Sequence, residues 1–143
     1  MKTADILYIE DNQNDIELTI RALEKRHLAN SMHIIKDGEE ALQYIFCKGK
    51  YAERDKNSNP KVIILDLNLP KVDGIEILRN IKSDEKTKTI PVVVLTSSRE
   101  ESDMIKSYNY GVNSYVVKPI NFDSFSEAVS SLGLYWLLVN ESL

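Results

Sequence analysis

The sequence is poor in cysteine, in runs of basic residues and in long apolar segments. Cys47 is its one cysteine, so the chain can form no internal disulfide and cannot build a thiolate metal cluster. No segment reaches the ~20 apolar residues that span a bilayer, and the first residues lack the apolar stretch of a secretory signal. We therefore expect a cytoplasmic protein without a membrane partner.

The charge balance argues against a nucleic-acid partner. With 22 acidic and 18 basic residues the net charge is -4, and the basic residues form no cluster of the kind that binds phosphate backbones. Of the 143 residues, 43% are apolar and 28% charged, which is near the average of globular domains. This length fits one domain, so we expect residues 1–143 to form a single one.

Three short apolar runs indicate strands that are buried on both faces. They are Ile6–Ile9, Val62–Leu65 and Val92–Leu95, and each is too short for a typical helix and rich in strand-forming residues. Because they lack polar alternation, they are typical of a parallel sheet with helices on both sides. Met32–Ile35 and Ser114–Val117 are weaker candidates, and the more polar Met32–Ile35 is expected at an edge.

Apolar residues at helical spacing separate these runs. The first helix follows Asn14 and Asp15, which we expect to serve as N-cap and first-turn acid. The apolar positions that mark the five expected helices are Ile16, Ile20 and Leu23; Ala41, Leu42 and Ile45; Ile75, Leu78 and Ile81; Met104, Ile105 and Tyr108; and Phe122, Phe125, Ala128, Val129 and Leu132. Five strand–helix units predict an α/β fold with a doubly wound, five-stranded parallel sheet.

The longest expected loop runs from Lys48 to Pro60. Its mixed charge is typical of a solvated surface segment, and Pro60 favours an extended backbone just before the third strand. His27 and His33 lack the spacing of metal ligands. We expect both histidines to be surface or helix-end residues without a catalytic role.

Polar residues stand directly at the ends of the expected strands. Glu10 and Asp11 follow the first strand, Asp66 ends the third, Thr96 ends the fourth, and Lys118 follows the fifth. In open α/β sheets, ligands bind outside the carboxyl ends of the strands. We therefore expect these five residues to converge on one crevice.

The three carboxylates of this crevice would repel one another unless a cation offsets their charge. Oxygen ligands without a nearby His or Cys select a hard ion, and so few carboxylates favour Mg²⁺ that keeps several waters over a dedicated Ca²⁺ cage. Mg²⁺ and Lys118 would together make the site receptive to a phosphoryl group, because both neutralise charge on its oxygens. The pattern therefore predicts phosphoryl chemistry.

Five separated elements of the sequence resemble the receiver domain of two-component response regulators. They are Glu10-Asp11, Asp66-Leu67-Asn68-Leu69-Pro70 with Asp73-Gly74, Thr96-Ser97-Ser98, Tyr115 and Lys118-Pro119. The resemblance covers essentially the whole chain, and five elements at the expected strand ends make it specific. It implies a flavodoxin-like fold with five helices and strand order 2-1-3-4-5, and a cis peptide bond before Pro119.

The resemblance implies that Asp66 is a covalent nucleophile, which attacks the phosphohistidine of a sensor histidine kinase and forms an acyl phosphate. Asp11 and Asp66 would bind Mg²⁺ through their carboxylates, Asn68 through its backbone carbonyl and Glu10 through water. Lys118 would pair with the phosphoryl oxygens. Such a protein is a phosphoacceptor that catalyses only its own phosphorylation and dephosphorylation, and is not otherwise an enzyme.

The resemblance also implies a conformational switch. The Thr96 hydroxyl would move to bond the phosphoryl group, and Tyr115 would swing inward behind it. The side chains of Asn68 and Ser98 would flank the path of the attacking water and so modulate hydrolysis. The surface around the fourth helix, fifth strand and fifth helix would then change shape.

The carboxyl end, Leu134–Val139, is more apolar than a helix that covers one face of a sheet requires. It belongs to an extension from about residue 133 to 143, which either folds back onto the last helix or meets a partner. With the long loop after the second helix, it resembles the receivers paired with phytochrome-type sensor kinases, a subgroup that is often dimeric. A homodimer through the 4-5-5 face (fourth helix, fifth strand and fifth helix) and this tail is our hypothesis.

Two other functions remain as alternatives. An Asp-nucleophile phosphatase of the haloacid-dehalogenase type also places an aspartate after an apolar strand with Mg²⁺, but it needs a second Asp where this chain has Asn68. A degenerate receiver that binds partners without being phosphorylated would lack the acceptor, the acid pair or the lysine, and all of these are present. Because the fifth helix and the tail exhaust the chain, we expect a stand-alone receiver whose output is contact with a protein that the sequence does not identify.

Overall fold

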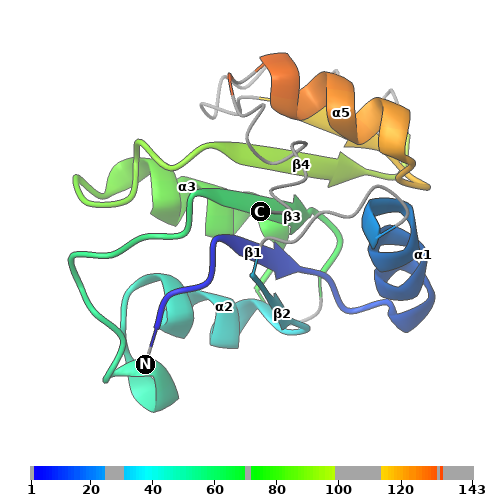
Figure 1. The fold of residues 1–143 in the computed structure, drawn as a ribbon. Coiled ribbons are helices and arrows are strands. Elements are labelled where there is room, and N and C mark those ends of the chain that lie inside the picture. The colour runs from blue at the N-terminus through cyan, green and yellow to red at the C-terminus, as the bar shows by residue number, and fades with distance from the viewer. Residues whose placement is uncertain (1, 25–30, 70–71, 99–113, 132, 134–143) are drawn as a thin grey trace.

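The computed structural model describes residues 2–24, 31–69, 72–98, 114–131 and 133. Within them, five parallel strands form one sheet in the order β2-β1-β3-β4-β5 (Figure 1). The strands are β1 (Ile6–Ile9), β2 (Met32–Ile35), β3 (Val62–Asp66), β4 (Val92–Thr96) and β5 (Ser114–Val117). The predicted α/β fold and its strand order are confirmed.

The apolar runs form strands because both faces of the sheet are covered. Successive side chains of a strand point to opposite faces, and in β1 Leu7 and Ile9 belong to one core cluster while Ile6 and Tyr8 belong to the other. Every residue of β3 and β4 is buried, so these central strands favour apolar side chains throughout. β2 lies at an edge of the sheet and is mostly half-buried, as its polar sequence predicts.

In the described part of the chain, four α-helices pack on the sheet: α1 (Gln13–Glu24), α2 (Gly38–Ile45), α3 (Gly74–Ser83) and α5 (Phe122–Ser131). α2 and α3 cover one face, and α1 and α5 cover the other (Figure 1). Among the described residues, no helix is both long and apolar enough to cross a membrane. The expected fourth helix, marked by Met104, Ile105 and Tyr108, and the apolar tail lie outside the described residues.

The start of α1 differs from the prediction. The helix begins at Gln13, and the Asn12 side chain accepts a hydrogen bond from the backbone N–H of Asp15 at 3.0 Å. Asn14, the predicted N-cap, therefore lies inside the helix, whereas Asp15 is a first-turn acid as predicted. Two asparagines lie so close together that capping preference alone does not choose between them.

The segment from Lys48 to Pro60 is mostly exposed, as predicted, but part of it is buried. It contains a short 3₁₀ helix, η1 (Gly49–Tyr51), and the side chains of Tyr51 and Arg54 are 4% and 2% exposed. The Arg54 guanidinium donates hydrogen bonds of 2.8 and 2.9 Å to the carbonyls of the last two residues of α2. The sequence did not predict this buried anchor, because an arginine that is buried and hydrogen-bonded looks, in sequence, like a surface charge.

Candidate functional site

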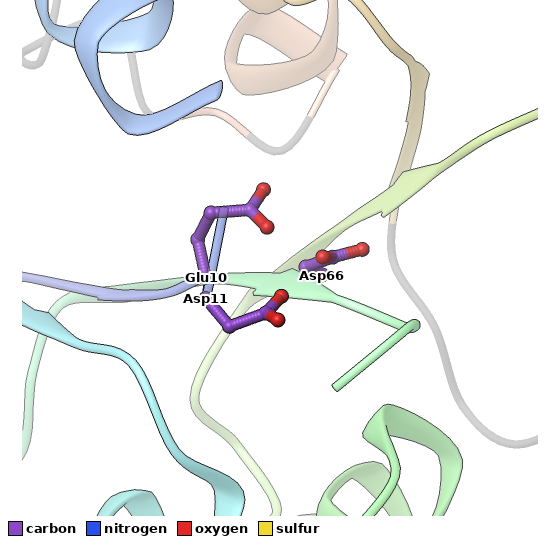
Figure 2. Close-up of side chains that lie close together, drawn as sticks. All are labelled: Glu10, Asp11 and Asp66. Atoms are coloured by element: carbon purple, nitrogen blue, oxygen red, sulfur yellow. The ribbon is translucent and has the colours of Figure 1, made fainter. Parts of the chain in front are cut away.

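Acidic side chains gather where β1 and β3 end. Glu10 follows β1 directly and Asp66 is the last residue of β3, and the parallel register places these two positions side by side. Glu10 is 0% exposed and Asp66 1%, whereas Asp11 is open to solvent. One carboxylate oxygen of each lies within 4.8 Å of the others, and Figure 2 shows the three side chains at the two strand ends. The structure thus brings the three predicted acids together.

Lys118 joins this cluster from the end of β5. Its Nζ lies 2.9 Å from Glu10 Oε1, 3.0 Å from Asp66 Oδ2 and 3.0 Å from Asp15 Oδ2. The Lys118 backbone N–H donates a hydrogen bond of 2.8 Å to the carbonyl of Thr96, which ties the ends of β4 and β5 together. The predicted inward lysine therefore contacts two of the three clustered acids.

Negative charge exceeds positive charge in the cluster. Burial, reinforced by the adjacent Asp66, raises the pKa of Glu10 to about 8, although Lys118 opposes the shift. Burial by itself lowers the pKa of Lys118, but bonds to Glu10, Asp15 and Asp66 outweigh it and raise the pKa above its ordinary value. The raised pKa of Glu10 reflects the crowding of acids that outnumber the one ammonium group, so the site favours a further cation.

Thr96 ends β4 beside the acidic cluster, as the strand pattern predicted. Its side chain is 0% exposed, and its hydroxyl Oγ1 has no hydrogen-bond partner among the described residues. Buried hydroxyls are almost always hydrogen-bonded, because leaving one unpaired is unfavourable. Within the described part of the chain, the Thr96 hydroxyl is therefore an exception to this rule.

The remaining predicted residues lie around the cluster. The Asn68 backbone N–H donates a hydrogen bond of 3.2 Å to Asp66 Oδ1, and the Lys118–Pro119 peptide bond is cis. Tyr115 is half-buried and packs against the core cluster on the α2–α3 face, where burial raises its pKa. Ser98 is partly exposed just beyond the end of β4.

Asp15 is a residue of this site that the sequence pattern did not assign to it. The prediction treated Asp15 as a first-turn acid of the helix, yet its carboxylate accepts a hydrogen bond of 3.0 Å from Lys118 Nζ. A signal was available, since Asp15 lies in the first turn of α1, which begins soon after the end of β1 and so at the same end of the sheet. The pairing itself joins positions 103 residues apart, which local pattern does not reveal.

The acidic cluster fits a hard divalent cation. Its donors are carboxylate oxygens from Glu10, Asp11 and Asp66, which suit Mg²⁺ better than a softer metal. Glu10 Oε1 is buried and has no hydrogen-bond partner among the described residues, although Lys118 Nζ lies 2.9 Å away. A buried carboxylate oxygen without a hydrogen-bond partner, in a cluster with excess negative charge, is a suitable ligand for a cation.

Comparison with known proteins gives matches over most of the chain. The response regulator receiver domain family matches residues 6–130. The response regulator Rcp1 of Synechocystis sp. is 38% identical over 132 residues, which cover 92% of this chain and 88% of Rcp1. The family match includes both the acidic pair Glu10-Asp11 and Lys118.

Solved structures give the same result and add the phytochrome connection. The bacteriophytochrome response regulator AtBRR is 50% identical with a TM-score of 0.89 over 97% of this chain and 99% of that one. The bacteriophytochrome response regulator RtBRR is 47% identical with a TM-score of 0.90 over 99% and 84%. A Mn²⁺-bound form of Rcp1 is 36% identical with a TM-score of 0.73 over 100% and 97%. This chain belongs to the response regulator receiver domain family, and its structural neighbours include phytochrome-associated response regulators.

Proposed function

We propose that this receiver domain accepts a phosphoryl group from a sensor histidine kinase onto Asp66, in a reaction that requires Mg²⁺, and signals through protein contacts. The observation that carries the proposal is the buried Asp66 carboxylate, 3.0 Å from Lys118 Nζ and clustered with Glu10 and Asp11. Buried acids crowded around one lysine are weak stabilisers of a fold. Such an arrangement is typical of a site that handles charge during a reaction.

In the proposed step, an Asp66 carboxylate oxygen forms a bond to the phosphorus of a phosphohistidine. The phosphorus–nitrogen bond breaks, and the imidazole leaves with the electron pair and takes up a proton from solvent. Lys118 stabilises negative charge on the phosphoryl oxygens, because its ammonium already lies beside Asp66 before the transfer. Hydrolysis of the acyl phosphate later restores the carboxylate and releases phosphate.

The acids of the cluster are the residues that would hold Mg²⁺. We assign Glu10, Asp11 and Asp66 to this role, together with the backbone carbonyl of Asn68. When bound, Mg²⁺ neutralises charge on the transferring oxygens. The Mn²⁺-bound form of the similar Rcp1 supports a divalent cation in a protein of this fold.

The switch that follows phosphorylation is proposed for Thr96 and Tyr115. The unpaired Thr96 hydroxyl supports it, because a phosphoryl group on Asp66 supplies acceptor oxygens that this hydroxyl lacks at present. Beryllofluoride, which mimics an aspartyl phosphate, is expected to shift the NMR signals of Thr96 and Tyr115 in the wild type and leave them unchanged in Asp66→Asn. Unchanged wild-type signals would remove this part of the proposal. Asn68 and Ser98 are proposed to modulate hydrolysis.

The kinase that we propose as partner is of the phytochrome type, on the support of the bacteriophytochrome response regulators that this chain is similar to. A reducing compartment, the cytoplasm, is proposed because Cys47 can form no internal disulfide. We further propose that residues 1–143 act as one domain and that its 4-5-5 face and apolar tail form a homodimer contact.

Two rival functions are weaker. A phosphatase of the haloacid-dehalogenase type would need a carboxylic acid where Asn68 stands, and an amide cannot serve as the general acid. A degenerate receiver would not need Glu10, Asp66 and Lys118 to be in contact, yet the three are in contact here. Neither rival is favoured by an observation of its own.

The proposal is tested by incubating the protein with acetyl phosphate and Mg²⁺ and measuring its intact mass. The wild type is expected to gain the mass of one phosphoryl group, and Asp66→Asn is expected to gain none. Asp55→Asn, which alters an exposed acid of the loop after α2, is the control and should be modified like the wild type. A wild type that stays at its unmodified mass would contradict the proposal.

A further inference from the structure

The Lys118 ammonium has carboxylate contacts on two sides, and those on only one side come from the acidic cluster. Glu10 and Asp66 contact Nζ from the strand ends, whereas Asp15 contacts it from the first turn of α1. Among the described residues, Asp15 is the one carboxylate whose contact with Nζ also has hydrogen-bond geometry. Asp15 is therefore the contact that holds the lysine from outside the acidic cluster.

Asp15 differs from Glu10 and Asp66 because it is not one of the residues that could hold a metal ion. Glu10 and Asp66 are members of the cluster that would share their oxygens with a cation, and Asp15 is not. Asp15 Oδ2 is thus available to Lys118 throughout the reaction, while the contacts of Glu10 and Asp66 must be shared or given up. A lysine has a flexible four-carbon stem, so a fixed partner outside the reacting cluster limits where its ammonium can go.

Solvent does not substitute for Asp15 easily. A cavity of about 10 Å³ lies next to the contact, lined in part by Glu10, Asp15, Thr19 and Lys118, and it holds one water molecule at most. The Lys118 side chain is 19% exposed and that of Asp15 29%, so the pair is partly shielded and its attraction exceeds that of a fully exposed ion pair.

We propose that Asp15 is a positioning residue for phosphoryl transfer: it holds Lys118 Nζ from the α1 side, through a contact that does not belong to the acidic cluster. This inference rests on the proposed function. Without Asp15, the Lys118 ammonium would lose its contact on the α1 side and would be less well placed for the phosphoryl oxygens. The Asp15 carboxylate itself does not touch the phosphoryl group.

Initial rates of phosphorylation by acetyl phosphate, read by intact mass at saturating Mg²⁺, test the proposal. Asp15→Ala is expected to slow modification by about tenfold to about a hundredfold, because a misplacement of about 1 Å can cost about a hundredfold in rate. Asp15→Asn keeps an acceptor oxygen without the charge and should fall between Asp15→Ala and the wild type. The matched control is Glu17→Gln, which removes one charge from the same helix, since Glu17 bonds Gln13 and not the lysine.

A second measurement excludes a merely structural effect of losing a first-turn acid. In the metal-free protein, the ¹⁵N-detected ammonium signal of Lys118, assigned by its loss in Lys118→Met, should be sharp in the wild type and in Glu17→Gln and broadened in Asp15→Ala. Equal rates and equal ammonium signals in Asp15→Ala and Glu17→Gln would overturn the role of Asp15 while leaving the acceptor function intact. No mass gain in the wild type would overturn both.

Discussion

At the scale of single residues, Thr96 carries a buried hydroxyl whose partner is absent from the described residues. An unpaired buried polar group costs about 1–3 kcal/mol. Thr96→Val keeps the shape of the side chain and removes the hydroxyl, so we expect the free energy of unfolding to rise by about 1 kcal/mol. Urea denaturation without phosphodonor or Mg²⁺ measures this change.

Thr19→Val is the matched control for that substitution. Thr19 is equally buried, at 1% exposed, but its hydroxyl lies 3.0 Å from the Tyr8 hydroxyl. Thr19→Val removes this hydrogen bond and leaves the buried Tyr8 hydroxyl without a partner. The free energy of unfolding should therefore fall by about 1 kcal/mol. A similar loss at both positions would mean that the Thr96 hydroxyl is bonded in the resting protein.

His33 on β2 should make the free energy of unfolding depend on pH. Its ring stacks on Tyr44 with centroids 4.8 Å apart, and its Nε2 lies 3.0 Å from the Tyr51 hydroxyl. Burial lowers its pKa below the ordinary 6.5, with Glu40 opposing the shift and Lys50 adding to it. Between the lowered pKa and 6.5, His33 therefore binds a proton in the unfolded chain but not in the folded chain. The free energy of unfolding falls as the pH falls from 6.5 through the lowered pKa.

The pH prediction is checked by urea denaturation of the wild type and His33→Gln between pH 7.5 and about 5. The wild type should lose more stability over this interval than His33→Gln, which has no group titrating at that position. Parallel curves would contradict the assignment. The expectation of a surface histidine was incomplete, because the partners of His33 come from α2 and η1 and not from its own strand.

At the scale of elements, the loop after α2 depends on Arg54. Besides its two bonds to the end of α2, the guanidinium donates to Thr3 Oγ1 at 2.9 Å and to the carbonyl of Ser58. Arg54→Lys supplies a compact ammonium that cannot reach acceptors on all sides. We expect the substitution to lower the free energy of unfolding by about 2 kcal/mol in urea denaturation.

The control for Arg54 is Lys56→Met, an exposed position of the same loop. It should change stability by no more than about 0.5 kcal/mol, as surface substitutions usually do. If Arg54→Lys were equally harmless, the loop would not be anchored as described. Sequence could not show this anchor, because its acceptors come from the amino end, the end of α2 and the loop itself.

Elements whose environment is uniform were the ones that sequence predicted well. β1, β3 and β4 are buried on both faces, so an unbroken apolar run is their direct signature. The sequence predicted that Glu10, Asp66 and Lys118 lie together, because their places follow from the strand ends alone. The bond of Asp15 to Lys118 was missed because it depends on how α1 packs next to the end of β5.

At the scale of the whole molecule, the proposed homodimer predicts that the apparent molecular mass in solution rises with protein concentration. Val117 on the edge strand β5 is 42% exposed, an apolar side chain on the face where the contact is proposed. Analytical ultracentrifugation should show dimers at high protein concentration, and Val117→Lys should weaken them. The control is Leu18→Lys on α1, which lies outside the proposed contact. Leu18 is also apolar and is 46% exposed, and its replacement should leave the dimers intact. Monomers at high concentration, with and without beryllofluoride, would contradict the dimer.

The central claim is that phosphoryl chemistry is localised to Asp66, and chemical trapping tests it most directly. Borohydride reduces an aspartyl phosphate to homoserine, so peptide mass spectrometry after treatment with acetyl phosphate and Mg²⁺ reads out the modified position. The account predicts homoserine at position 66, in amounts that fall when Mg²⁺ is chelated. Homoserine at Asp11 or at another acid, or none at all, would contradict it.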